Sequence, residues 1–222
     1  MFSFESFARL NAFLTGVYRV AWLNVLWVAV TVLGLVVVGV GPATYAMAKY
    51  LDRWFRLGEA PPVLPTFMGY CRELRWRPVV VGWVLLAAAA VITVNLLGVH
   101  DGYLRTLNLV MLAVVAIIGI YVFFVMAALD VDTLPRVLAS ALLLGLGSFH
   151  LTIIGAAVTG GAVYLLLRFA PLLLLMFGVG IPMAAAAVVV RFALRDLRPG
   201  PPATDTPRAV AASRQTAVEV LR

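Results

Sequence analysis

The chain has 222 residues, of which 64% are apolar and only 12% are charged, and its mean hydropathy is +1.04. These fractions lie far outside the usual ranges of soluble domains, so they exclude a soluble fold and indicate a polytopic membrane protein. The net charge of +7 does not indicate a nucleic-acid partner, because the basic residues cluster beside the ends of apolar segments, where anionic lipid headgroups would meet them.

The N-terminal 19 residues are predicted to form an interfacial helix, because apolar side chains recur there at helical spacing. Five apolar stretches then reach the ~20 residues needed to cross a hydrocarbon core about 30 Å thick. These predicted spans are residues 20–40, 79–99, 107–129, 149–167 and 169–190. The first is longer than the apolar part of a cleaved signal peptide, so we expect it to remain in the mature protein. The sequence therefore predicts an all-α membrane helix bundle.

A sharp junction follows the first predicted span, at Gly41, Pro42, Ala43 and Thr44. Proline suits the first turn of a helix, and glycine can end the preceding helix with a positive φ. Residues 43–57 are then predicted to form an amphipathic helix along the membrane surface. One face carries Met47, Tyr50, Leu51 and Trp54, and the other carries Lys49, Asp52, Arg53 and Arg56.

A membrane-embedded position for residues 43–57 is the alternative. It is disfavoured because charged side chains in hydrocarbon cost a few kcal/mol each. A second surface helix is predicted over residues 66–77, and a third over 137–146, which Asp132 or Thr133 can cap. Residues 1–198 are expected to form a single transmembrane domain, followed by a disordered cytoplasmic tail at 199–222.

The orientation follows from the distribution of Lys and Arg. With five spans, 13 of the 17 basic residues fall on the side that holds the C-terminus, and four fall on the other side. Because basic residues accumulate in cytoplasmic loops, the C-terminus is predicted to be cytoplasmic and the N-terminus external.

No motif for catalysis or metal binding is found. The two histidines, His100 and His150, are predicted to lie on opposite sides of the membrane, so they cannot share a zinc ion. Asp130 and Asp132 fit helix capping better than a carboxylate metal site, and Cys71 fits a small packed residue or at most a lipidation site. We therefore expect neither an enzyme nor a cofactor.

Three polar side chains within or beside the spans are predicted to face neighbouring helices, because an amide or imidazole facing lipid would be costly. They are Asn24, Asn95 and His150. Small-residue pairs such as Gly155 and Thr159 mark the fourth span as a close-packing surface. The fifth span is predicted to kink at Gly178, Gly180 and Pro182.

Aromatic residues of the first two surface helices are candidates for docking a partner protein, because Trp, Tyr and Arg are enriched at binding hot spots. The candidates are Tyr50, Trp54, Tyr70 and Trp76. The same residue types also anchor membrane proteins at lipid headgroups, so both interpretations remain open.

The order of these features resembles the YesL-like family of bacterial integral membrane proteins, whose molecular function is undefined. The resemblance rests on Asn24-Val25-Leu26-Trp27, on Gly41-Pro42-Ala43-Thr44, and on the amphipathic and aromatic-basic segments that follow, and it covers about residues 1–198. Members of that family are often encoded beside sugar-uptake ABC transporters. The resemblance therefore implies an accessory role in carbohydrate uptake, in the bacterial cytoplasmic membrane.

Two function classes follow. The first is a non-catalytic accessory or assembly partner of a carbohydrate ABC permease, and self-association is an alternative partnership. The second is a small carrier or channel acting on its own, in which Asn24, Asn95, His150 and the kink at Pro182 would line the pathway. A water-filled cavity lined by those residues would favour the carrier, and a dry bundle would favour the partner.

Overall fold

The computed structural model describes residues 4–74, 76–128 and 133–195. Over these residues every regular element is helical and no strand occurs, which confirms the all-α class. Four of the described helices are long and apolar enough to cross a membrane, or five if a bent pair counts as one span. Asp130, Asp132 and the predicted tail 199–222 lie outside the described residues.

Helix α1 (Phe4–Leu33) is one continuous helix of 30 residues, about 45 Å long. The predicted separate interfacial helix is therefore wrong, and the first candidate span runs over Ser6–Leu33 instead of 20–40. The chain turns back on itself over residues 34–39. Leu35 and Val36 have φ values of +53° and +64° there, in the left-handed region that residues other than glycine rarely adopt.

The junction at Gly41 also differs from the prediction. Gly41 and Pro42 lie inside the first turn of α2 (Val40–Asp52), so Gly41 does not end the preceding helix. Glycine is needed here because a Cβ on Gly41 would lie 2.0 Å from the carbonyl oxygen of Pro78. Pro42 occupies the first turn as expected, where its missing N–H needs no partner. The chain at this point thus forms a close backbone contact between two helices.

Helix α2 forms the centre of the molecule and continues into a π-helical turn, η1 (Arg53–Leu57). It contacts α1, α3, α4, α5 and α9. Most of its side chains are buried, including Tyr45, Met47 and Leu51. The prediction of a helix lying on the membrane surface is therefore corrected: α2 is the core of the helical hub. Its charged residues tolerate this position because each has an oppositely charged partner, as described below.

The second predicted surface helix is α3 (Val63–Glu73), which packs beside α2 with Phe67 fully buried. Helices α4 (Arg77–Gly98) and α5 (Gly102–Ala128) then form an antiparallel hairpin. Their bounds lie within a few residues of the predicted second and third spans, apart from an earlier start of α5.

Helix α6 (Leu134–Gly147) follows, and Thr133 occupies its N-cap position without a side-chain capping bond. Helix α7 (Phe149–Phe169) matches the predicted fourth span. The predicted fifth span is divided into α8 (Pro171–Phe177) and α9 (Gly180–Arg195), which meet at an angle of 44°. This break confirms the kink predicted from the two glycines and the proline.

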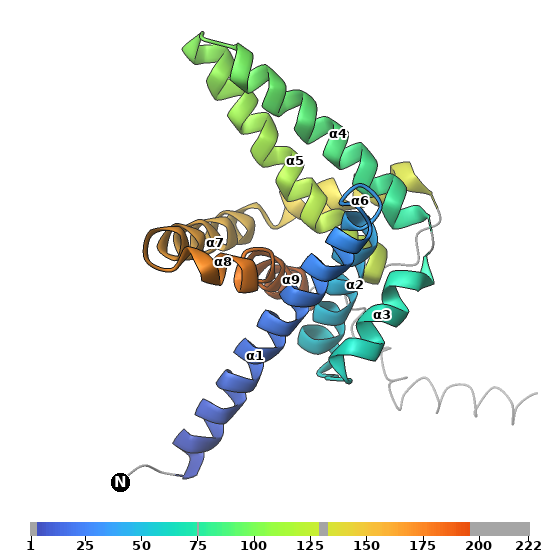
Figure 1. Ribbon diagram of the computed structural model, residues 1–222, viewed down its shortest axis with the longest axis vertical. Coiled ribbons are helices and arrows are strands. Elements are labelled where there is room, and N and C mark those ends of the chain that lie inside the picture. Colours follow the sequence, from blue (N-terminus) through green and yellow to red (C-terminus); the bar gives the residue numbers. More distant parts are fainter. Residues whose placement is uncertain (1–3, 75, 129–132, 196–222) are drawn as a thin grey trace, which may run out of the picture.

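Three arms extend from the hub formed by α2, α3, α6 and α9 (Figure 1). They are the N-terminal half of α1, the α4–α5 hairpin and the α7–α8 pair. The arms expose long apolar surfaces: only 6% of the most apolar stretch of α7 is buried. The hub therefore holds the side-chain packing, and the arms offer surfaces suited to lipid or to other membrane helices.

Candidate functional site

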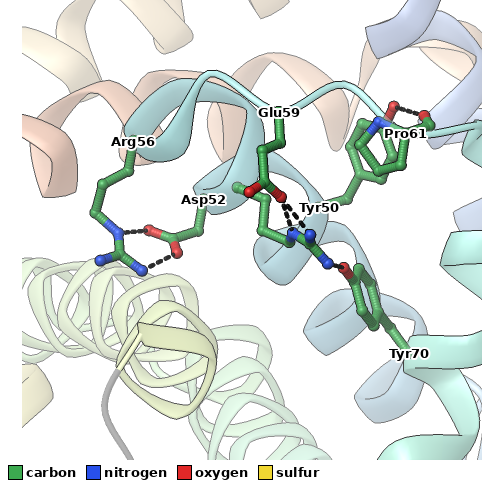
Figure 2. A network of polar contacts seen from close by, with 7 residues as sticks. Tyr50, Asp52, Arg56, Glu59, Pro61 and Tyr70 are labelled. Carbon is green, nitrogen blue, oxygen red and sulfur yellow. Dashed lines mark hydrogen bonds and ion pairs between the residues drawn. The ribbon is translucent and has the colours of Figure 1, made fainter.

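The charged residues of α2 and η1 form a cluster with residues of the following loop and α3. We call this group the hub cluster. Its members are Lys49, Asp52, Arg53, Arg56, Glu59, Tyr70 and Glu73, and Figure 2 shows part of it.

Asp52 is the most deeply buried charge of the hub cluster, with only 4% of its surface exposed. Arg56, one helical turn later, holds it through two hydrogen bonds: Nε donates to Oδ1 at 2.9 Å and a terminal nitrogen donates to Oδ2 at 2.7 Å (Figure 2). Such a two-point contact satisfies both carboxylate oxygens. It explains how a carboxylate from the predicted polar face can be buried.

Arg53 joins the loop after η1 to α3. Its Nε donates to Glu59 at 2.8 Å, and another guanidinium nitrogen donates to the hydroxyl of Tyr70 at 2.6 Å. The hydroxyl of Tyr50 donates to the carbonyl of Pro61 at 2.7 Å, in the same loop (Figure 2). These contacts fix the path of the chain between the two helices.

Lys49 connects α2 directly to α3, because its Nζ contacts both carboxylate oxygens of Glu73, at 2.5 and 2.6 Å. The ammonium also lies over the ring of Tyr70, 4.9 Å from the centroid. Burial acts to lower the pKa of Lys49, but the hydrogen bonds that its ammonium donates to Glu73 and the nearby Tyr45 outweigh burial and raise the pKa. Lys49 therefore stays charged in the hub.

The hub cluster is built of paired charges that link α2 and η1 to the following loop and to α3. Each charged side chain of α2 and η1 is occupied by a partner, and among the residues of the three described ranges no group of His, Cys, Asp or Glu could hold a metal ion. The sequence disfavours an embedded position for residues 43–57, because charges in hydrocarbon are costly. Ion pairing offsets that cost, and the spacing of charges along one helix does not reveal the pairing.

The four candidate docking aromatics have different environments. Tyr50 is fully buried and Tyr70 is bound to Arg53, so neither ring is free to meet a partner. Trp54 stacks near Phe55, 4.9 Å between ring centroids, with the guanidinium of Arg19 5.5 Å from its ring. Only Trp76 among the four presents a largely free surface, with 66% exposed.

Asn24 faces another helix, as predicted. It is 1% exposed and lies against the break between α8 and α9. Its Oδ1 accepts hydrogen bonds from the backbone N–H groups of Val179 at 3.0 Å and Gly180 at 2.8 Å, and its Nδ2 donates to the carbonyl of Leu175 at 2.6 Å. One amide side chain thus satisfies three backbone groups that the broken helix leaves open.

The other two predicted interhelix residues are placed differently. Asn95 is exposed on α4, so the expectation that it faces a helix is wrong within this chain. His150 is also exposed, and it borders a crevice of about 930 Å³ between α5, α6, α7 and α9. The three residues that a carrier pathway would combine are therefore not brought together.

The close-packing prediction for the fourth span holds at one position. A Cβ on Gly155 would meet Val189 of α9 at 3.5 Å, whereas Gly160 and Gly161 face open space.

Cys71 is partly buried, with its thiol 3.8 Å from the carbonyl of Pro42. Burial raises the pKa of that thiol to about 11, against a small opposing effect of Arg72. This environment fits a packed residue and not a nucleophile.

One contact escaped the sequence interpretation although both partners were singled out. The indole N–H of Trp27 on α1 donates to Oγ1 of Thr44 on α2, at 3.0 Å. The two short motifs that carry the family resemblance therefore touch each other. The sequence does show Thr44 two residues after Pro42, which indicates the start of a helix. The spacing of residues does not show that Trp27 is the hydrogen-bond partner of Thr44.

Comparison with known proteins supports the YesL-like resemblance. Residues 20–96 match the family described as "Protein of unknown function, DUF624". The uncharacterized protein YesL of Bacillus subtilis (strain 168) is 38% identical over 81 residues, which cover 36% of this chain and 38% of the relative. The uncharacterized protein YteU of the same organism is 31% identical over 98 residues, 44% of each chain. The chain thus matches less than half the length of these curated relatives, and no solved structure matches it.

Proposed function

We propose that this chain, which resembles the YesL-like membrane proteins over residues 20–96, is a non-catalytic accessory or assembly partner of a carbohydrate ABC uptake system. In this proposal it lies in the bacterial cytoplasmic membrane. In this proposal the substrate binds to the ABC system and not to this chain. The charged side chains of α2 and η1 are already paired with one another or with residues 59 and 73, so they are not open to a substrate.

The supporting observation is the exposed turn between α3 and α4. Trp76 projects there with 66% of its surface exposed, and Arg72 and Arg77 on either side are exposed as well. Trp and Arg carry much of the binding energy at protein interfaces. The hub cluster holds α3 rigidly against α2 through the pair of Lys49 and Glu73, so the turn is presented on a fixed support.

The exposed arms support a lateral partnership in the membrane. Helix α7 is almost unburied, and Gly160 and Gly161 leave space for another helix to approach closely.

The test is crosslinking in native cells followed by purification in a mild detergent. Wild type is expected to recover a sugar ABC permease, and Trp76→Ala is expected to lose it while inserting normally. Trp22→Ala is the matched control, because Trp22 is an exposed tryptophan on α1, away from the turn. Recovery of the permease with Trp76→Ala and wild type alike would contradict docking at this turn.

The orientation is part of the same proposal: the hub faces the cytoplasm and the N-terminus lies outside. A reporter fused after Arg198 is expected to be active in the cytoplasm, and a tag before Phe2 should be accessible to an impermeant label. Neutralising Arg72 and Arg77, which flank a span end, should weaken this orientation more than neutralising Arg208 and Arg214. A cytoplasmic N-terminal tag would contradict the orientation.

The alternative is a small carrier acting on its own. The observation in its favour is the crevice beside His150, together with the break between α8 and α9, because broken helices form substrate sites in transporters. Asn24 already binds the backbone groups freed by the break, which favours the accessory role. Uptake of a sugar by liposomes that contain only this protein would instead establish the carrier.

A further inference from the structure

The crevice between α5, α6, α7 and α9 is a second feature with its own chemistry. Its volume of about 930 Å³ lies within the range of small-molecule sites. The lining is mainly apolar and includes Phe124, Leu143, Leu144, Leu151, Val190 and Leu194. A carbohydrate would leave most of its hydroxyl groups without partners on such walls, which is costly. The lining therefore selects an apolar ligand.

A basic residue one helical turn from the crevice lining indicates that the ligand also has an anionic end. Three polar residues line the crevice: Ser140 lies in the middle of α6, and Ser148 and His150 follow its C-terminal end. Arg136 precedes Ser140 by one helical turn on α6, so it lies on the face that also carries Leu143 and Gly147. This arginine is exposed and stands at the first turn of the helix. An anionic group at that end would meet a positive side chain and the positive end of the helix dipole.

The position of the crevice identifies the source of such a ligand. It is partly open and is bounded by α5 and α7, which are long and apolar enough to cross a membrane, and by α9 of the bent pair. Its rim includes Leu143, 70% exposed, and Phe192, 48% exposed, so the opening is apolar where these helices would meet lipid. We infer that the crevice holds an acyl chain of an anionic phospholipid from the surrounding bilayer, with the headgroup phosphate at Arg136.

Gly147 provides a direct test of the acyl-chain site. A Cβ added there meets no atom within 4 Å, and the residue lines the crevice, so Gly147→Phe is expected to occupy part of the crevice. Gly98→Phe is the matched control, since Gly98 is equally open but lies at the end of α4 and does not line the crevice. Native mass spectrometry of each variant, purified from phosphatidylglycerol-containing membranes, measures retained phospholipid.

Wild type and Gly98→Phe should retain phosphatidylglycerol, and Gly147→Phe should reduce the retained fraction by about tenfold. The smaller change Gly147→Leu should give an intermediate loss and keeps the test valid if the phenylalanine variant fails to fold. Equal retention in wild type and in a folded Gly147 variant would overturn the proposed site.

The headgroup assignment is tested separately with vesicles of phosphatidylglycerol or phosphatidylcholine. Arg136→Gln should reduce the preference for phosphatidylglycerol about fivefold, because a basic residue near an anionic membrane surface contributes about 1 kcal/mol. Arg136→Lys should keep most of the preference, and Arg105→Gln, an exposed arginine at the tip of the α4–α5 hairpin, should leave it unchanged. An unchanged preference in Arg136→Gln would overturn the role of Arg136.

Discussion

Trp27 and Thr44 join the first two helices through a single hydrogen bond, from the indole N–H to Oγ1 at 3.0 Å. The threonine hydroxyl also donates to the carbonyl of Val40, at 2.6 Å, within the first turn of α2. The bond therefore holds the start of α2 against α1 just after the chain has reversed its direction. It ties together the two motifs on which the family resemblance rests.

Thr44→Val is expected to lower the free energy of unfolding by about 1 kcal/mol. The change leaves the indole N–H of Trp27 without its partner in a half-buried position. Thr93→Val is the control, because Thr93 bonds only to the carbonyl of Ala89 in its own helix and is exposed. Unfolding in detergent, followed by tryptophan fluorescence, measures the difference. Equal effects of the two substitutions would show that the interhelix bond contributes nothing.

Gly41→Ala should be among the most destabilising single substitutions in the chain. The new Cβ would lie 2.0 Å from the carbonyl oxygen of Pro78, a backbone atom that cannot rotate away. Separating α2 from α4 is expected to cost about 3 kcal/mol or more. The folded fraction recovered from membranes, measured by size-exclusion chromatography, should fall sharply.

Gly69→Ala is the matched control for this change. Gly69 lies in α3 with no atom within 4 Å of an added Cβ, so alanine there should stabilise the helix by about 0.5–1 kcal/mol. If both variants behaved alike, the close approach of the two backbones would not matter for folding.

Asn24→Leu should destabilise the junction of α8 and α9 specifically. It leaves the N–H groups of Val179 and Gly180 without an acceptor, and each unsatisfied buried group costs about 1–3 kcal/mol. Hydrogen exchange of the segment 175–183 should increase in the variant. Asn95→Leu, at an exposed site on α4, should change stability by less than about 0.5 kcal/mol. Unchanged exchange in Asn24→Leu would show that the break is held by other contacts.

Cys71 should react slowly with maleimide at pH 8. A thiol with a pKa of about 11 is ionised about a hundredfold less at that pH than one with the ordinary value of 9.0. Because burial raises the pKa, the neutral thiol is the form favoured in the fold, and reactivity should rise about tenfold per pH unit until the pKa is reached. A cysteine introduced at Gly69 in a Cys71→Ala background provides the exposed reference. Equal rates at the two positions would contradict the buried environment.

The sequence predicts the helices of this fold well and their burial poorly. Long apolar stretches locate α4 and α7 within a few residues, and Gly178, Gly180 and Pro182 predict the break in the last span. These features depend on local composition. The reversal at residues 34–39 was missed because Leu35 and Val36 are residues that rarely take a positive φ.

The burial of α2 was missed for a different reason. Its charges lie on one face, which is the pattern of a surface helix, and their partners Glu59 and Glu73 come from segments whose position the spacing does not specify. Asp52 pairs with Arg56, one helical turn later. In the sequence such a buried ion pair has the same spacing as a solvent-exposed one. The crevice was missed because four helices contribute to it, three of them at their ends.

The bonds of Asn24 also have a consequence for the order in which the chain enters the membrane. Asn24 is made early, and the carbonyl of Leu175 that it binds follows 151 residues later. At translation rates of about 5–20 residues per second, this interval lasts roughly 8–30 s. During that time α1 must keep an amide in the bilayer without its final partners, while α8, with only 7 residues, is too short to cross the membrane alone. We therefore expect Asn24 of the first helix to be held by the insertion machinery or by another polar group until the last helices are made, so that this contact between the two ends of the fold forms late.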